Sequence, residues 1–270
     1  MTACNVSIGQ FSSVQPATPK RVIFCDFDGP IVDVSERYYQ TYLKGLLAVE
    51  LAAELATAQG QPLLAREQGL NLKPLSKAQF WRMKQNRVAD LEIAMRSGLP
   101  AELFDPFMQQ VKRIVNHPNL LRWDSLQPAA LGALHYFKQR NIRLVLVTLR
   151  HPRQVQAFLR SQGLEPLIDE VFGALDMNAA HANRVDHKCE LLMQAIAQQK
   201  DLGHLTQNSW MIGDTEADVR AGQLMGLSTA ALCCGVRSKT YLQTLSPSKV
   251  YGCLMTAALD VVKMPLLQAA

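Results

Sequence analysis

From Leu126 onward, short apolar runs alternate with stretches in which apolar residues recur at helical spacing. Residues 143–148 form a strand-like run, and in residues 152–162 apolar side chains recur three and four residues apart until Gly163 ends the pattern. The same alternation predicts helices at 128–140, 187–200 and 215–225 and strands at 171–173, 210–213 and 229–234. Strands that alternate with helices are joined by right-handed crossovers. The pattern therefore predicts an α/β fold with a doubly wound, Rossmann-like parallel sheet.

The segment before this alternating region contains no convincing strand. Residues 35–59 are rich in Leu and Ala, which favour helix. Ser76 and Gln79 have the spacing of a capping box, and we expect the helix that they open to run through Leu91. The remaining elements expected here are a loop at 60–74 and a helix at about 100–116 that breaks or begins near Pro106.

These patterns divide the chain into three parts. The expected boundaries are a flexible polar tail at 1–20, a Rossmann-like core at 21–34 and 124–270, and an inserted all-helical domain at 35–123. The two linkers between core and insertion are expected at 33–36 and at about 117–127.

Two carboxylates follow the apolar run at residues 22–25, which has the character of a buried strand. Asp26 and Asp28 are two residues apart, so they project from one side of the strand's C-terminal end. Carboxylates so close together repel, and a divalent cation or a bound proton relieves the repulsion. Gly29 then allows a sharp turn or the close approach of a phosphate. Taken alone, this segment is equally compatible with a solvated Asp-Gly turn.

Three further polar signals follow in order along the chain. Thr148 ends one predicted strand, Lys188 begins a predicted helix, and Asp214 and Asp218 follow another predicted strand. Ligands of doubly wound sheets bind at the C-terminal ends of the strands. Because Asp26, Thr148 and Asp214 all occupy such ends, we expect them to share one site.

With these four motifs the chain resembles the haloacid dehalogenase-like superfamily over about residues 21–235, apart from a variable middle. The family's motifs are strand-DxDG, strand-Thr/Ser, a lone Lys and strand-GDxxxD, and most members are Mg²⁺-dependent phosphatases. One departure is Pro30, where relatives commonly carry a residue other than proline. It stiffens the loop but removes no functional group.

The resemblance implies a role for each motif residue. Asp26 would attack phosphorus to form an aspartyl-phosphate, and Asp28 would protonate the leaving oxygen and then activate water. Gly29, Thr148 and Lys188 would contact the phosphoryl group. For Lys188 the sequence leaves open a solvated lysine, with Arg184 as the functional cation instead.

The resemblance also implies a magnesium site. Its ligands would be Asp26, Asp214 and the backbone carbonyl of Asp28, with Asp218 supporting the metal shell and Lys188. The alternative for Asp214 and Asp218 is a helix N-terminus with a capping acid.

The helical insertion resembles the family's cap domain, which closes over the site and selects the leaving group. Lys84 and Arg87 lie beside the expected buried face of a cap helix, so we expect them to contact the substrate. The alternative is a solvated basic edge. Two other residues, Arg150 and His151, follow Thr148 closely and either flank the pocket or lie on the surface.

Composition narrows the partners. The net charge of +5 is modest and the basic residues form no aromatic-interleaved stripe, which argues against nucleic acid as a partner. No apolar run reaches the ~18 residues of a membrane helix, and the N-terminus carries neither a secretory signal nor the arginines of a transit peptide. The six cysteines lack metal-ligand spacing and are expected to be buried free thiols, which suits the cytoplasm. A small phosphorylated metabolite is the expected substrate.

Three other functions share these motifs. A phosphosugar mutase uses the same aspartyl-phosphate but returns the phosphoryl group to the substrate. A metal-independent dehalogenase is disfavoured by Asp28 and by the GDxxxD motif, and an inactive binding or regulatory protein is disfavoured because all motif groups are present.

Overall fold

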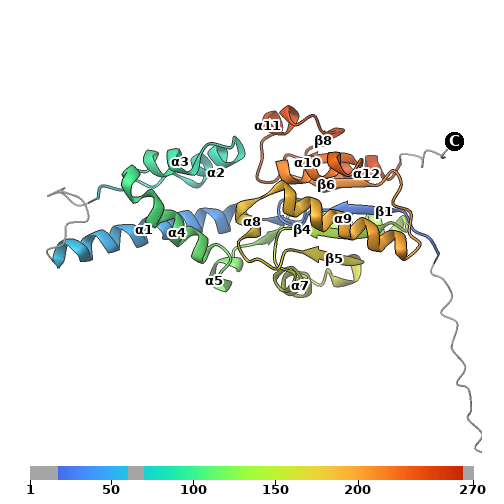
Figure 1. Cartoon of the computed structure of the whole chain (residues 1–270), viewed down its shortest axis with the longest axis horizontal. Helices are drawn as coiled ribbons and strands as arrows, with labels where there is room; N and C mark the ends of the chain where they lie inside the picture. The colour runs from blue at the N-terminus through green and yellow to red at the C-terminus, as the bar shows by residue number, and fades with distance from the viewer. Residues whose placement is uncertain (1–17, 60–69, 264–270) are drawn as a thin grey trace, which may run out of the picture.

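The computed structural model describes residues 18–59 and 70–263. At its centre is a six-stranded parallel sheet in the order β5-β4-β1-β6-β7-β8 (Figure 1). These strands are β1 (Val22–Cys25), β4 (Arg143–Thr148), β5 (Glu170–Gly173), β6 (Trp210–Gly213), β7 (Ser228–Leu232) and β8 (Lys249–Tyr251). The predicted α/β fold with a parallel sheet is therefore confirmed.

Helices cover both faces of this sheet. They are α6 (Ala130–Gln139), α7 (Pro152–Ser161), α8 (Ala179–Ala182), α9 (Val185–Asp201), α10 (Glu216–Leu224), α11 (Lys239–Thr244) and α12 (Leu254–Val261), with a short 3-10 turn η2 (Glu165–Leu167) after α7.

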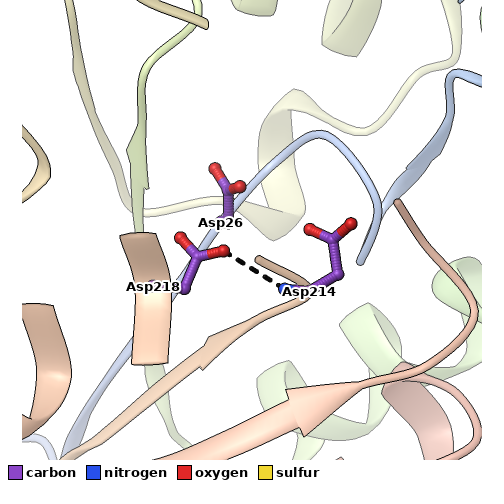
Figure 2. A group of neighbouring side chains, drawn as sticks. All are labelled: Asp26, Asp214 and Asp218. Carbon is purple, nitrogen blue, oxygen red and sulfur yellow. Dashed lines mark hydrogen bonds between the residues drawn. The ribbon is translucent and has the colours of Figure 1, made fainter. Parts of the chain in front are cut away.

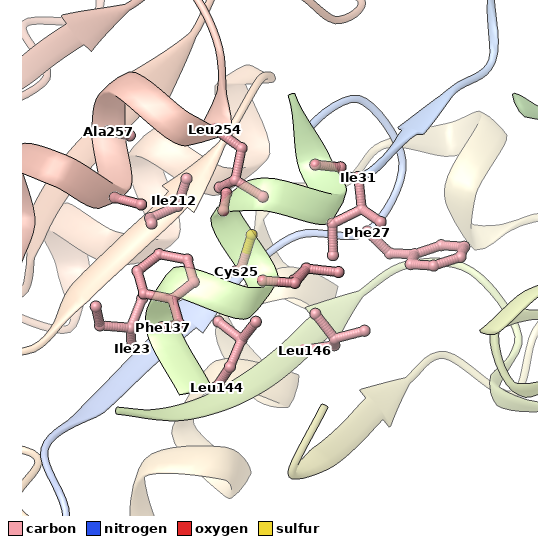
Figure 3. Close-up of a cluster of buried hydrophobic side chains, with 14 of the residues drawn as sticks. Ile23, Cys25, Phe27, Ile31, Phe137, Leu144, Leu146, Ile212, Leu254 and Ala257 are labelled. Atoms are coloured by element: carbon pink, nitrogen blue, oxygen red, sulfur yellow. The ribbon is translucent and has the colours of Figure 1, made fainter. Parts of the chain in front are cut away.

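Alternate residues of β1 point to opposite faces, and all four are buried. Ile23 and Cys25 pack among α6, α7 and α12, whereas Val22 and Phe24 pack against α9 and α10. Figure 3 shows the first of these clusters, in which Phe137 of α6 lies against Ile23. Burial on both faces explains why this strand is continuously apolar instead of alternating with polar residues.

The insertion between β2 (Val32–Asp33) and β3 (Ser125–Leu126) contains only helices among its described residues, and these two short strands pair with each other. Its helices are α1 (Ser35–Ala58), α2 (Lys77–Gln85), α3 (Asp90–Arg96), α4 (Phe104–Ile114) and α5 (Pro118–Leu121), with a 3-10 turn η1 (Ala101–Leu103) before α4. Tyr42, Leu46, Phe80, Ile93 and Phe107 belong to a hydrophobic cluster of its own. Figure 1 shows α1 extending away from the sheet along the length of the insertion.

The helix predicted to run from Ser76 through Leu91 is wrong in its length. The capping box of Ser76 and Gln79 is present, but α2 ends at Gln85 and a new helix begins at Asp90. Arg87 between them has a φ of 57°, in the left-handed region that ends helices. Because the chain turns there, Leu91 is exposed instead of buried.

Two further expectations differ at the C-terminal end. The last strand was expected at 229–234, but β7 ends at Leu232. The chain then continues through α11, β8 and α12, and β8 adds a further strand to the sheet. The short β8 lies at the sheet edge and is only partly buried, so it lacks a strong apolar pattern.

Some expectations fall on residues outside the described part of the chain. The polar tail lies mostly at 1–17, and most of the loop expected at 60–74 lies at 60–69. Within the described residues the cysteines are free, although only Cys25 is buried, and none of the helices there combines the length and apolarity needed to cross a bilayer.

Candidate active site

Three neighbouring strands bring their C-terminal ends together at the centre of the sheet. Because β1 lies between β4 and β6, Asp26, Thr148 and Asp214 emerge side by side at one edge. The Asp26 amide donates to the Ile212 carbonyl at 2.8 Å, which extends the β1–β6 pairing by one residue. The strand-end placement thus groups residues that are far apart in sequence.

Asp26, Asp214 and Asp218 form a cluster of three buried carboxylates (Figure 2). One oxygen of each lies within 4.8 Å of the others. The Val236 amide donates to Asp214 Oδ2 at 2.6 Å, but Asp214 Oδ1 has no hydrogen-bond partner among the described residues. A buried carboxylate oxygen without a donor is costly unless a cation or proton satisfies it.

Lys188 is the ammonium group within this cluster. It lies in the first turn of α9, and its Nζ contacts Asp26 Oδ1 at 2.9 Å and Asp218 Oδ1 at 2.8 Å. It also donates a hydrogen bond to the Val147 carbonyl at 2.8 Å, which fixes the position of the ammonium group. Arg184 instead pairs with Asp186 on the surface, which excludes it as the cation of this site.

Asp218 shapes the loop around the cluster. Its Oδ2 accepts from the Thr215 amide at 3.0 Å and the Asp214 amide at 3.2 Å, while its Oδ1 contacts Lys188. The expected support of Lys188 and the alternative role as a capping acid are therefore both present in one side chain.

Burial and mutual repulsion dominate the electrostatics of the cluster. Burial and the charge of Asp218 raise the pKa of Asp26 to about 7, although Lys188 opposes the shift. Burial, Asp218 and Asp26 likewise raise the pKa of Asp214 well above its ordinary value. Burial would lower the pKa of Lys188, but Asp218 and Asp26 outweigh it and the pKa is raised.

Two glycines make room for Asp214. A Cβ on Gly29 would lie 2.1 Å from Asp214 Cγ, and a Cβ on Gly235 would lie 2.1 Å from Asp214 Oδ2. Gly29 also has a φ of 91°, and its amide donates to the Val32 carbonyl. Its amide is thus engaged within the loop, and the expectation that Gly29 binds phosphate gains no support from this geometry.

Asp28 is held by two arginines. Arg37 Nη2 lies 2.9 Å from Asp28 Oδ2, and Arg150 Nη1 lies 2.9 Å from Asp28 Oδ1. Burial would raise the pKa of Asp28, but Arg150 and Arg37 reverse the effect and the pKa is lowered. Asp26 and Asp28 therefore have opposite environments although they are two residues apart.

Thr148 reaches the same site from β4. Its Oγ1 accepts from the Arg150 amide at 3.2 Å, which leaves the hydroxyl hydrogen available as a donor. Arg150 contributes to the lining of the cleft, whereas His151 caps α7 by accepting from the Arg153 amide. Of the two residues that follow Leu149, the arginine belongs to the site.

A cleft of about 490 Å³ opens over these groups. Its floor includes Asp26, Asp28 and Thr148, and its roof includes Lys84 and Arg87 of the insertion. Both roof cations are paired, Lys84 with Asp90 at 2.7 Å and Arg87 with Glu216 at 2.8 Å. The structure thus brings the insertion and the strand ends to opposite sides of one space.

The carboxylate cluster fits a divalent cation. Three carboxylates face one ammonium group, so the ionised cluster keeps an excess of two negative charges. The oxygen-only donor set is the kind that Mg²⁺ prefers. The unpartnered Asp214 Oδ1 gives such an ion a ligand that no protein donor already occupies.

Sequence reasoning missed several residues of the site. Arg37, Asp124, Glu216 and Arg237 form ion pairs around the cleft, but none of them is a defining residue of the four motifs. Nothing in the sequence singled out Arg37, because an arginine in the first turn of a helix is ordinarily exposed to solvent. Glu216 occupies a variable position within the GDxxxD motif, and that position was the signal that could have identified it.

Solved structures of similar fold come from several bacteria. A hydrolase of the haloacid dehalogenase-like family from Streptococcus pneumoniae has a TM-score of 0.59 and 16% identity, over 89% of this chain and 97% of that one. A protein described as a predicted phosphoglycolate phosphatase from Haemophilus somnus has a TM-score of 0.58 and 18% identity, over 92% of this chain and 100% of that one. A predicted phosphatase from Clostridium acetobutylicum gives 0.58 and 14%, again over 92% and 100%. At identities this low, the structural similarity shows a shared fold alone.

The sequence itself supplies the family. A comparison with curated proteins gave no significant match. The family model of haloacid dehalogenase-like hydrolases matches residues 20–226, which span the first strand, the helical insertion and the GDxxxD motif. The chain belongs to the haloacid dehalogenase-like hydrolase family.

Proposed function

We propose that this protein is a Mg²⁺-dependent phosphatase that hydrolyses a small phosphate monoester through an aspartyl-phosphate. The observation that carries the proposal is the buried cluster of Asp26, Lys188, Asp214 and Asp218 at adjacent strand ends beneath the cleft. It pairs a nucleophile with a fixed ammonium group and a cation site. Phosphatase names among the similar structures agree with the proposal.

In the first half of the reaction a carboxylate oxygen of Asp26 attacks phosphorus. Because Arg37 and Arg150 keep Asp28 ionised in the free protein, Asp28 must first take up a proton from solvent as the negatively charged ester enters the cleft. The bond between phosphorus and the leaving oxygen then breaks, and Asp28 donates that proton to the leaving oxygen. Lys188 and the Thr148 hydroxyl stabilise the negative charge of the phosphoryl oxygens. In the second half Asp28 takes a proton from water, the water oxygen attacks phosphorus, and the bond to Asp26 breaks to release phosphate.

The residues that would hold Mg²⁺ are Asp26, Asp214 and the carbonyl of Asp28, with Asp218 behind them. When bound, the ion would neutralise charge on the transferring group. Lys188 already pairs with Asp26 and Asp218. Asp214, whose Oδ1 has no hydrogen-bond partner among the described residues, is therefore the carboxylate that most needs a cation.

The helical insertion acts as the cap in this proposal. It would exclude water and contact the leaving group, and Lys84 and Arg87 in the roof of the cleft are its candidate specificity residues. The substrate is a small phosphorylated metabolite. We place the enzyme in the cytoplasm, which agrees with the free cysteines of the described residues.

The test is a screen of the purified protein against phosphorylated metabolites and p-nitrophenyl phosphate, with Mg²⁺ or with EDTA. We expect phosphate release only with Mg²⁺. Asp26→Asn should lower turnover by about a thousandfold or more, because an amide cannot form the covalent intermediate. Undiminished activity in EDTA, or an Asp26→Asn variant that keeps more than about a thousandth of the turnover, would refute the proposal.

A further inference from the structure

Asp28 forms one corner of a closed ring of four charged side chains. Arg37 and Arg150 each bridge Asp28 to Asp124, with Arg37 Nε 3.0 Å from Asp124 Oδ1 and Arg150 Nη2 bonded to Asp124 Oδ2. Two carboxylates therefore alternate with two guanidinium groups. The ring carries no formal net charge, so it needs no further counterion.

The four residues come from separate segments. Arg37 lies in the first turn of α1, and Asp124 directly precedes β3, so these two residues stand where the chain enters and leaves the insertion. Asp28 and Arg150 follow β1 and β4, the strands that carry the first two motifs. The ring ties the proposed acid–base residue to both ends of the insertion.

Of the four ring residues, Asp28 has the most exposed side chain. Its side chain is 14% exposed, whereas the side chains of Arg37, Arg150 and Asp124 are at most 2% exposed. Each oxygen of Asp28 accepts from one guanidinium group, and a carboxylate oxygen has a second acceptor direction. The remaining direction of each oxygen is the one left for a group in the cleft.

We propose that Arg37 and Asp124 are positioning residues for proton transfer by Asp28. Asp124 fixes the far sides of both guanidinium groups, and they in turn fix the two oxygens of Asp28. Arg37 is fixed further because its Nη1 donates to Asn116 Oδ1 at 3.2 Å. The inference rests on the proposed function, since it assumes that Asp28 transfers the proton.

Stability alone is a poor explanation for such a ring. Buried ion pairs are often no more stabilising than apolar residues of similar volume, because desolvation offsets the attraction. A ring that merely joined segments would have no reason to place one carboxylate against the reacting groups. Fixed orientation of that carboxylate is a benefit that apolar packing could not supply.

The test compares two substrates that differ in their need for a proton. p-Nitrophenolate leaves as a stabilised anion, whereas the alkoxide of glycerol 2-phosphate must be protonated as it leaves. The variant is Arg37→Met with Asp124→Asn, which removes one charge of each sign. We expect its kcat/KM to fall about 10–100-fold for glycerol 2-phosphate and less than about threefold for p-nitrophenyl phosphate, since general acid catalysis contributes about 100-fold or more.

A double-mutant cycle supplies a second readout. In an Asp28→Asn background, the Arg37→Met and Asp124→Asn changes should cost almost nothing more, because the group that they position is already disabled. Arg37→Lys, which keeps the charge without the two-armed geometry, should show a smaller effect of the same selectivity. It serves as the working variant if the double substitution melts below the assay temperature.

Arg143→Met is the matched control. Arg143 also pairs with two carboxylates, Asp169 and Glu170, but at the opposite end of β4. Its loss should affect both substrates equally. Equal losses for both substrates in the ring variants, or full additivity with Asp28→Asn, would overturn the positioning role while leaving the phosphatase proposal intact. A wild type that hydrolyses no phosphate ester would overturn both.

Discussion

At the scale of single residues, repulsion among Asp26, Asp214 and Asp218 governs the site. Lys188 contacts only two of these three carboxylates, and Asp214 relies on one backbone amide. Burial of the third carboxylate without a cation raises its pKa, which is a cost to the folded protein. The residue arrangement that suits metal binding is thus unfavourable in the metal-free chain.

This cost predicts that Asp214→Asn stabilises the metal-free protein. The asparagine keeps an acceptor for the Val236 amide but removes a charge beside Asp26 and Asp218. We expect the thermal midpoint in EDTA to rise by roughly 2–4 °C for each kcal/mol of relieved repulsion. Differential scanning calorimetry measures the shift.

Magnesium should reverse the order of thermal stability of the wild type and Asp214→Asn. The wild type should gain stability with rising Mg²⁺ concentration through ligand linkage, and Asp214→Asn should gain little. The control is Asp176→Asn, a carboxylate on the surface away from the cluster, which should keep the response of the wild type. Identical Mg²⁺ responses in wild type and Asp214→Asn would argue against Asp214 as a ligand.

At the scale of elements, the site residues that lay at strand ends could be predicted from the sequence. Buried strands and their C-terminal polar residues are local signals, so Asp26, Thr148 and Asp214 were grouped correctly. The Asn86–Arg87 break could not be found this way, because neither glycine nor proline marks it and Arg87 adopts the left-handed conformation. Asp124 escaped for another reason, since its partners are distant in sequence.

The last turn of α2 and the break that follows it place Lys84 and Arg87 over the cleft, and this predicts a selective defect. Lys84→Ala and Arg87→Ala should each lower kcat/KM for the best metabolite several-fold while sparing p-nitrophenyl phosphate, because contacts with the natural leaving group are lost. Arg82→Ala on the same helix serves as control, since Arg82 does not contribute to this cleft. Steady-state kinetics with both substrates measures this selectivity. If the variants change kcat/KM equally for both substrates, residues other than Lys84 and Arg87 determine the specificity.

Helix α1 offers a second prediction, because its two faces differ. Leu46 is buried in the insertion's hydrophobic cluster, whereas Leu51 is 49% exposed. Leu46→Ala should cost about 2–5 kcal/mol of unfolding free energy, and Leu51→Ala should stay within about 0.5 kcal/mol. Urea denaturation of both variants provides the comparison. Similar losses for both would mean that another surface covers the exposed face of α1.

At the scale of the whole molecule, two of the contacts between the insertion and the core are made by residues that line the cleft or adjoin its lining. One is the ring of Arg37, Asp124, Arg150 and Asp28 at the linkers. The other lies at the end of α2, where the Ser238 amide donates to the Gln85 carbonyl at 2.8 Å. The insertion is therefore fixed both where it joins the core and across the opening of the cleft.

Glu216 is central to the contact across the opening. It accepts from Arg87 of the insertion at 2.8 Å and from Arg237 of the core at 2.7 Å, and Arg237 also donates to the Lys84 carbonyl at 3.4 Å. Because the Gln85–Ser238 hydrogen bond lies beside this ion pair, the Ser238 amide reports on whether the insertion stays docked.

Glu216→Gln should loosen this contact without altering the reacting groups. The neutral amide keeps the shape of the carboxylate but loses the attraction to both arginines, so the insertion should separate from the core more often. We expect hydrogen exchange at the Ser238 amide to accelerate several-fold, while amides of β1 exchange as in the wild type. Glu92→Gln is the matched control, because Glu92 pairs with Arg96 on the outer side of the insertion. Unchanged exchange at Ser238 in Glu216→Gln would show that the backbone contacts alone hold the insertion against the core, and the ion pairs would then have to be assigned to substrate selection.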